Sequence, residues 1–273
     1  LSLQSWRFAI TPIGGALGTA LILPLADYLY PGDRATGIQV AMALFGAIGC
    51  VMFIICFVTT KERVQPIKEE NLNIARDVKI LFRNDQWRIL SIYNFMMLVA
   101  VVIRGGAVVY YVNTVLNKGA DIISYFMLGG MLASMFGSVL AQPFGTRFCK
   151  VKLSFWINNI NAVLDVACFW LPLEFWVIPL IAHVLIQIVQ GGNGALQWSM
   201  ITDANNYGEW KTQRRITGMN FAANIFVIKL GVAVGGAILG WVLAWFNYQS
   251  NSTVQSESAV QAVLLQFTVR PSD

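Results

Sequence analysis

Charged residues are scarce in this sequence of 273 residues, where Asp, Glu, Lys and Arg together make up only 12%. Soluble globular domains carry roughly 25% charged residues. A chain of this size with half that density has too little polar surface to be surrounded by water. Hydrophobic residues account for 56%, so the composition predicts a protein whose solvent is a lipid bilayer.

Signatures of catalysis and metal binding are also missing. The sequence has a single histidine, and neither H-E-x-x-H, G-x-S-x-G nor a G-x-x-x-x-G-K-[ST] phosphate loop occurs in it. We therefore expect no enzyme, no cofactor and no metal site. The four cysteines lack C-x-x-C spacing and lie in or beside apolar runs. This favours a role as small buried hydrophobic residues, without disulfides, over a redox or metal-binding role. They are Cys50, Cys56, Cys149 and Cys168.

Long apolar runs are what the sequence has in abundance. A bilayer core about 30 Å thick needs about 20 apolar residues in a helix, and the runs are too long, and alternate too little, for barrel strands. The sequence therefore predicts an all-α polytopic membrane protein with about seven complete transmembrane helices. The expected spans are 8–30, 37–59, 89–116, 123–143, 153–171, 176–201 and 217–246. A further apolar stretch begins at about Ala259 and is too short to span.

Lysine and arginine predict the orientation of these spans, because cytoplasmic loops of membrane proteins are enriched in them. They concentrate in 60–88, 144–152 and 202–216, and the loops between these segments hold few. We expect all three segments in the cytoplasm. The net charge of +5 is then a topology signal, and we expect the lipid bilayer, not nucleic acid, as the partner.

The segment 60–88 is the only long polar stretch, and its apolar residues in NLNIARDVKILF recur at helical spacing. We interpret it as a cytoplasmic linker between two bundles. Residues 1–59 are then the last two helices of an N-terminal bundle. Residues 89–273 are a C-terminal bundle of five helices plus a truncated sixth.

Ionisable side chains within the expected spans are candidates for function, because a charge at the centre of a span costs roughly 2.5–3.5 kcal/mol. For Lys229, deep in its span, a functional role is favoured over a structural charge. Arg104 fits substrate binding and bracing of the bundle equally. Asp165 is interpreted as pairing with a basic residue in preference to titrating, and His183 as a packing residue in preference to a functional one. Arg7 by itself is interpreted as an anchor at the membrane interface.

The segment GGNGALQWSMITD at 191–203 is unusual for a membrane span. Asn193 and Gln197 supply amide donors and acceptors, and Trp198 supplies a flat apolar face, a combination that suits a sugar. Interhelical amide hydrogen bonds with an interfacial tryptophan explain the same residues equally well.

The residues that follow this segment resemble the signature of a known family. DANNYGEWKTQRR at 203–215 is similar to the D-x-x-x-Y-G-E-[WFY]-K/R-x-x-x-R signature of the glycoside–pentoside–hexuronide:cation symporters, the melibiose permease-like branch of the major facilitator superfamily. Lys229 follows Tyr207 by 22 residues, and the family has a lysine in its eleventh helix. Similar short stretches are W-R-F at 6–8, P-G-D-R at 31–34, R-N-D-Q at 83–86 and G-A-x-x-Y-Y at 106–111.

The resemblance covers essentially the whole chain and implies a partial major facilitator bundle, helices five to eleven of the family. Helices one to four and most of the last are then expected to be absent. The family's cation-binding carboxylates lie on those absent helices, so that Asp165 is the only carboxylate here for Lys229. Gly194 stands where melibiose permease has a sugar-stacking tryptophan, which leaves the identity of the sugar open.

The resemblance also implies roles for individual residues. Arg7, Gln197 and Trp198, with Asn193 nearby, would line the sugar site, and Lys229 would lie beside the cation site. The signature residues would form a cytoplasmic gate, favoured over a merely solvated loop; they are Asp203, Tyr207, Gly208, Glu209, Lys211 and Arg215.

We therefore expect a secondary transporter that moves a sugar or glycoside with Na⁺ or H⁺ by alternating access. It would be a multi-pass protein of the bacterial inner membrane and a monomer when complete. The alternatives are a facilitator for another small solute and a non-transporting membrane sensor or inactive fragment; a membrane enzyme is the least favoured.

Overall fold

The computed structural model describes most of the chain. Outside the described part lie residues 1, 62–73, 171–174, 215, 249–259, 261–262, 265–266 and 268–273, together with some side chains of α1 and a few elsewhere. The described residues form helices and their connections, and no strand occurs among them. The all-α prediction is confirmed.

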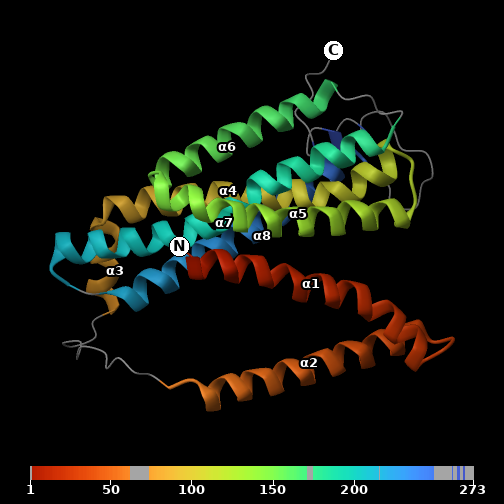
Figure 1. The fold of residues 1–273 in the computed structure, drawn as a ribbon, viewed down its shortest axis with the longest axis horizontal. Coiled ribbons are helices and arrows are strands. Elements are labelled where there is room, and N and C mark those ends of the chain that lie inside the picture. Colours follow the sequence, from red (N-terminus) through yellow and green to blue (C-terminus); the bar gives the residue numbers. More distant parts are fainter. Residues whose placement is uncertain are drawn as a thin grey trace. The chain divides into compact units, whose positions relative to one another are not determined.

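The chain divides into two compact units, one of residues 10–72 and one of residues 1–9 and 73–273. The smaller unit contains most of α1 (Ser2–Leu29) and all of α2 (Arg34–Thr59), which diverge from the turn between them (Figure 1). Asp33 caps α2 by accepting hydrogen bonds from the backbone N–H of Thr36 at 3.2 Å and from its hydroxyl at 2.6 Å. The assignment of the units to the two halves of a transporter stays a prediction.

The larger unit contains the other helices, and its members pack on one another. They are α3 (Ile74–Arg83), α4 (Asp85–Tyr110) with a π-helical turn at Tyr111–Val115, α5 (Ala120–Arg147), α6 (Lys150–Ala167) with a 3₁₀ turn at Cys168–Trp170, α7 (Val177–Thr212) and α8 (Thr217–Trp245). Within the linker predicted at 60–88, α3 is the helix expected from its apolar spacing.

All seven expected spans form helices. Among the described residues, five helices are long and apolar enough to cross a membrane: Ala35–Thr59, Asp85–Val115, Asp121–Arg147, Val177–Thr212 and Thr217–Trp245. The helix α6 is shorter and carries Lys150, Lys152 and Asp165. In α1 only some side chains belong to the described part.

The prediction of a loop at 202–216 is wrong for most of that segment, because α7 continues through the signature to Thr212. The helix ends where Gln213 takes a left-handed conformation with φ 54°. A helix of 36 residues is about 54 Å long, far more than a bilayer core of about 30 Å. The polar last turns of α7 therefore extend beyond the hydrocarbon, where water can satisfy their charges.

Close helix contacts in the larger unit depend on glycine. On α5 and α7, a Cβ at Gly137 would overlap the carbonyl of Ile188, and one at Gly191 would overlap that of Ser134. On α8, Gly231 and Gly235 face α4 at a looser but still close contact, with an added Cβ 3.0 Å from the nearest α4 atom. These glycines therefore allow close helix packing, whereas a Cβ added at Gly14, Gly15 or Gly236 would meet no atom within 4 Å.

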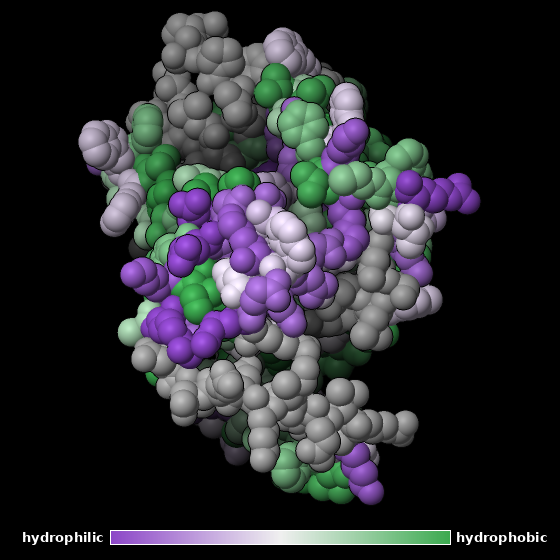
Figure 2. Space-filling model, turned by 90° about the vertical axis from the view of Figure 1, so that its left-hand side faces the viewer, coloured by the Kyte–Doolittle hydropathy of each residue, from purple (hydrophilic) through white to green (hydrophobic). Residues whose placement is uncertain are grey.

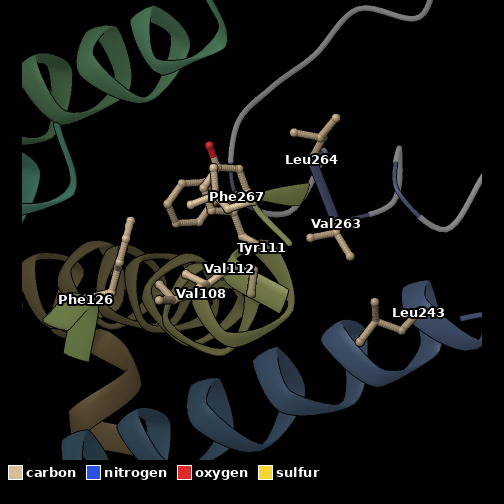
Figure 3. Close-up of a cluster of buried hydrophobic side chains, with 10 residues drawn as sticks. Val108, Tyr111, Val112, Phe126, Leu243, Val263, Leu264 and Phe267 are labelled. Carbon is tan, nitrogen blue, oxygen red and sulfur yellow. The ribbon is translucent and has the colours of Figure 1, made fainter. Parts of the chain in front are cut away.

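One end of the larger unit has an apolar core, drawn in Figure 3. It joins the end of α4, the start of α5, the end of α8 and helical residues near the C-terminus; the buried members labelled there are Val108, Tyr111, Val112, Phe126, Leu243, Val263, Leu264 and Phe267. The Phe267 ring stacks on Tyr111 with centroids 4.1 Å apart. Within the predicted short apolar stretch, residues 260, 263, 264 and 267 thus have the spacing of one helix face.

The cysteines differ from expectation in burial. Three of them, Cys50, Cys56 and Cys149, are exposed, and Cys168 is half-buried; all four thiols are free. Cys50 and Cys56 lie on α2, where an exposed face suits lipid, because lipid tails solvate apolar side chains as well as a protein core does.

Candidate functional site

A polar pocket of about 310 Å³ lies between α4, α6 and α7 of the larger unit. Charged, imidazole and amide groups line it; the polar members are Arg104, Asn158, Asn161, Asp165, His183, Gln187 and Gln190. Polar groups within spans normally face a cavity or a partner. The pocket gathers three of the ionisable residues singled out in the sequence.

Arg104 and Asp165 form an ion pair in this pocket, with Arg104 Nε and Asp165 Oδ1 3.1 Å apart and the two side chains 17% and 29% exposed. The sequence favoured a basic partner for Asp165, and the structure supplies Arg104. The contact is not aligned as a hydrogen bond, so Arg104 Nε, Arg104 Nη2 and Asp165 Oδ1 have no hydrogen-bond partner among the described residues. The pair is electrically balanced while keeping free donors and an acceptor.

Two further polar side chains of the pocket are buried, and each has one atom that makes no hydrogen bond among the described residues. His183 is 4% exposed and has a hydrogen bond with the backbone of Phe126, but its Nδ1 has no partner in the described structure. Asn161 donates to Gln190, and its own Oδ1 has no partner there either. Unsatisfied buried polar atoms are costly, and because these atoms have almost no accessible surface, only a turn of their side chains toward the pocket would expose them to a ligand or water.

Beside the pocket, Asn193 of α7 is the centre of a polar network. Its side chain is 0% exposed, accepts hydrogen bonds from Tyr93 at 3.1 Å and Ser154 at 2.8 Å, and donates to Asn158 at 3.1 Å. The Asn158 amide in turn donates to the Tyr93 hydroxyl at 2.8 Å. The network fastens α4, α6 and α7 to one another.

Gln197 lies one turn further along α7, where it is 5% exposed and donates to Asn94 of α4 at 2.7 Å. The half-buried Trp198 stacks on Phe221 of α8, with ring centroids 6.4 Å apart. In this structure Asn193 and Gln197 therefore make the interhelical amide bonds that the sequence left open as an alternative. Their role toward a sugar stays a prediction.

The other two residues assigned by the resemblance lie away from this pocket or outside the described part. Lys229 is exposed on α8, and among the described residues no carboxylate pairs with it. Asp165, the carboxylate that the sequence offered to Lys229, pairs with Arg104 instead. The Arg7 position is in α1, but its side chain is outside the described part.

The signature residues fasten the polar end of the bundle. Asp203 of α7 binds Lys150 at the start of α6, with Oδ2 and Nζ 2.6 Å apart. Tyr207 lies one turn further along α7 and Lys211 two turns, and both donate hydrogen bonds to Asp85 at the start of α4. Figure 2 shows hydrophilic side chains gathered at this end.

The remaining signature residues have different surroundings. Gly208 packs against the Asn84 amide, which donates to the carbonyl of Ala204 at 2.8 Å. Glu209 is half-buried, and Arg215 lies outside the described residues. The ion pairs bring together the ends of the segments predicted to be cytoplasmic, whereas their role as a gate stays a prediction.

Sequence reasoning missed most of the network and of the pocket. On α6 the signal was available: Ser154, Asn158, Asn161 and Asp165 follow one another at steps of 4, 3 and 4 residues, which is one face of a helix. Tyr93 and Asn94 on α4 give no such pattern, because they stand among apolar residues.

The fold defines a multi-pass helical membrane protein. Residues 1–272 match the family model described as MFS/sugar transport protein, and the chain belongs to this family of the major facilitator superfamily.

Individual relatives agree with this membership. The chain is 34% identical over 272 residues to the inner membrane symporter YicJ of Escherichia coli, covering 100% of the chain and 59% of that protein. It is 34% identical to the putative glycoside/cation symporter YagG of the same organism, covering 99% of the chain and 58% of YagG. The isoprimeverose transporter of Lactiplantibacillus pentosus is 25% identical, and the match covers 99% of the chain and 57% of that transporter. The chain thus spans less than two thirds of the length of these relatives.

Proposed function

We propose that this chain is part of a secondary transporter that carries a sugar or glycoside together with Na⁺ or H⁺ across the bacterial inner membrane. The observation that carries the proposal is the family match over residues 1–272. Relatives named as symporters, as a glycoside/cation symporter and as a transporter of isoprimeverose support the cargo and the coupling. The function is transport, not catalysis.

The structure supports a transport role in two ways. Its larger unit has apolar residues on its outside, such as Phe155, Phe226 and Trp241, which suits lipid, and polar groups between α4, α6 and α7. Its polar end holds α4, α6 and α7 together through ion pairs of exposed charges, which water and salt can weaken. Such contacts suit an end that must change its neighbours when access alternates.

Transport assays on the complete transporter that contains this chain, reconstituted in proteoliposomes, test the proposal. An imposed Na⁺ or proton gradient should drive accumulation of a labelled glycoside, because coupling links the two fluxes. Equilibration without accumulation would indicate a facilitator instead, and no sugar-dependent flux at all would favour a sensor.

A chimera tests the contribution of this chain to sugar selection. Residues 1–273 would replace the matching stretch of the isoprimeverose transporter, whose name supplies a measurable cargo. We expect uptake with altered preference among glycosides. A chimera that is inserted, folded and unable to bind any sugar contradicts the proposal.

A further inference from the structure

We propose that the pocket between α4, α6 and α7 binds a neutral polyhydroxyl compound of monosaccharide size. It is a second site of the larger unit, and it uses none of the residues assigned to the sugar and cation sites by family resemblance, namely Arg7, Asn193, Gln197, Trp198 and Lys229.

The size of the pocket admits such a compound. Its volume of about 310 Å³ is at the lower end of the range for small-molecule sites, roughly 300–1,000 Å³. Three helices contribute to its lining, so a ligand would be held from several sides. Met97, Val101 and Ile186 also line it and supply apolar surface.

The chemistry of the pocket matches hydroxyl groups. The lining combines the N–H donors of Arg104 with the Asp165 carboxylate, whose side chains are 17% and 29% exposed. The amides of Gln187 and Gln190 add further donors and acceptors. A hydroxyl both donates and accepts, so one polyol can satisfy groups of both kinds at once. An apolar ligand would leave them unsatisfied, which costs more than the contact gains.

The charge of the pocket selects a neutral ligand. Arg104 and Asp165 already balance each other at 3.1 Å. A cationic ligand would meet the guanidinium and an anionic ligand would meet the carboxylate, and burial of an additional charge is unfavourable in either case.

Protection of an introduced cysteine from alkylation tests the site. Ala162 lines the pocket from α6, and Ala162→Cys would be made in the chain with Cys50, Cys56 and Cys168 replaced by Ala. Iodoacetamide reaction in lipid nanodiscs would be followed at each cysteine by peptide mass spectrometry. The retained Cys149, exposed before the start of α6, serves as the internal reference.

We expect D-glucose to slow alkylation at position 162 while Cys149 reacts unchanged. At ten times the dissociation constant the slowing should be about tenfold, because only the unoccupied fraction reacts. Glucuronate and protonated glucosamine, which share the ring, should protect much less. A cysteine at 162 that never reacts, or that reacts equally with and without each of the three sugars, overturns the proposal.

Two variants separate binding from a structural role of the ion pair. Asp165→Asn keeps the shape but leaves Arg104 unbalanced, so glucuronate should become a better protector than glucose. Gln187→Leu, which removes one amide of the lining, should raise the glucose concentration needed by about fivefold. Unaltered preference among the sugars in Asp165→Asn contradicts the charge argument even if glucose protects.

The outcome is independent of the proposed transport function. Failure of protection removes this second site and leaves symport untouched, because Arg7, Gln197 and Lys229 are not involved. Protection without any transport by the complete protein in proteoliposomes would support a sugar-binding membrane protein and remove the symporter.

Discussion

At the scale of single residues, the position of a side chain on its helix changes its chemistry. Cys149 immediately precedes α6, and the backbone N–H groups of Lys152 and Val151 near its sulfur lower the pKa of its thiol. The thiolate is stabilised there because the start of a helix has free N–H donors. Since the folded chain has the lower pKa, this group favours folding above the unfolded pKa, and the contribution is lost as the pH falls through the folded value.

The prediction for Cys149 concerns the pH dependence of its alkylation. The rate with iodoacetamide should reach half its maximum at a lower pH in the folded chain than in the chain denatured with detergent. Peptide mass spectrometry at a series of pH values measures both. Equal midpoints in the two states would mean that the N–H groups of α6 do not stabilise the thiolate.

The Arg104–Asp165 pair leads to a second prediction at this scale. Removal of one partner leaves the other charge buried, which typically costs about 3 kcal/mol or more. Arg104→Ala and Asp165→Ala should each destabilise the chain by about that much, and the double variant should lose less than either. Unfolding in mixed micelles measures the three values, and strictly additive losses would show that the two groups do not interact.

At the scale of helices, adjacent glycines on α8 have opposite environments. A Cβ at Gly235 would lie 3.0 Å from the Val99 carbonyl oxygen and from the Val102 Cβ, both on α4, whereas Gly236 has open space. Gly235→Leu should force α4 and α8 apart and lower stability by about 1–3 kcal/mol. Gly236→Leu is the matched control with little expected loss.

Thermal unfolding of the two glycine variants in the same lipid gives the comparison. The difference between neighbouring positions separates helix packing from helix propensity, because both substitutions replace glycine by the same residue in one helix. Similar losses at 235 and 236 would contradict the packing of α8 on α4 seen here.

At the scale of the whole molecule, apolar run length was sufficient to predict the helical spans, because the bilayer sets their length. The family signature was readable from residues 203–215, but its conformation was not. Those residues are polar, which in a membrane protein is typical of a loop, and only the ion pairs with Lys150 and Asp85 show why they continue as helix.

The pocket could not be predicted from the sequence for a related reason. Arg104, Asp165 and His183 were each recognised as unusual, but a hydropathy pattern says nothing about which faces of α4, α6 and α7 meet. The basic partner favoured for Asp165 could therefore not be named from the sequence, and the fold brings Arg104 there.

The last prediction concerns Lys229, for which the larger unit has no counter-charge among its described residues. An ammonium on the exposed face of α8 is unfavourable in lipid, so it should be stable only beside a carboxylate from elsewhere in the complete transporter. A cation bound by that carboxylate would compete with Lys229 and so link ion occupancy to helix position. Lys229→Ala should therefore abolish cation-driven sugar accumulation while sugar binding persists.

Proteoliposome uptake with and without an ion gradient, together with equilibrium sugar binding, measures both sides of this prediction. Lys229→Arg, which keeps the charge, should retain part of the coupling, and Leu230→Ala on the same exposed face should behave like the wild type. Because the Arg104–Asp165 pair is internally balanced, its removal should leave the ion dependence unchanged where Lys229→Ala removes it. Normal ion-dependent accumulation in Lys229→Ala would make this lysine a structural charge and move the coupling to other residues.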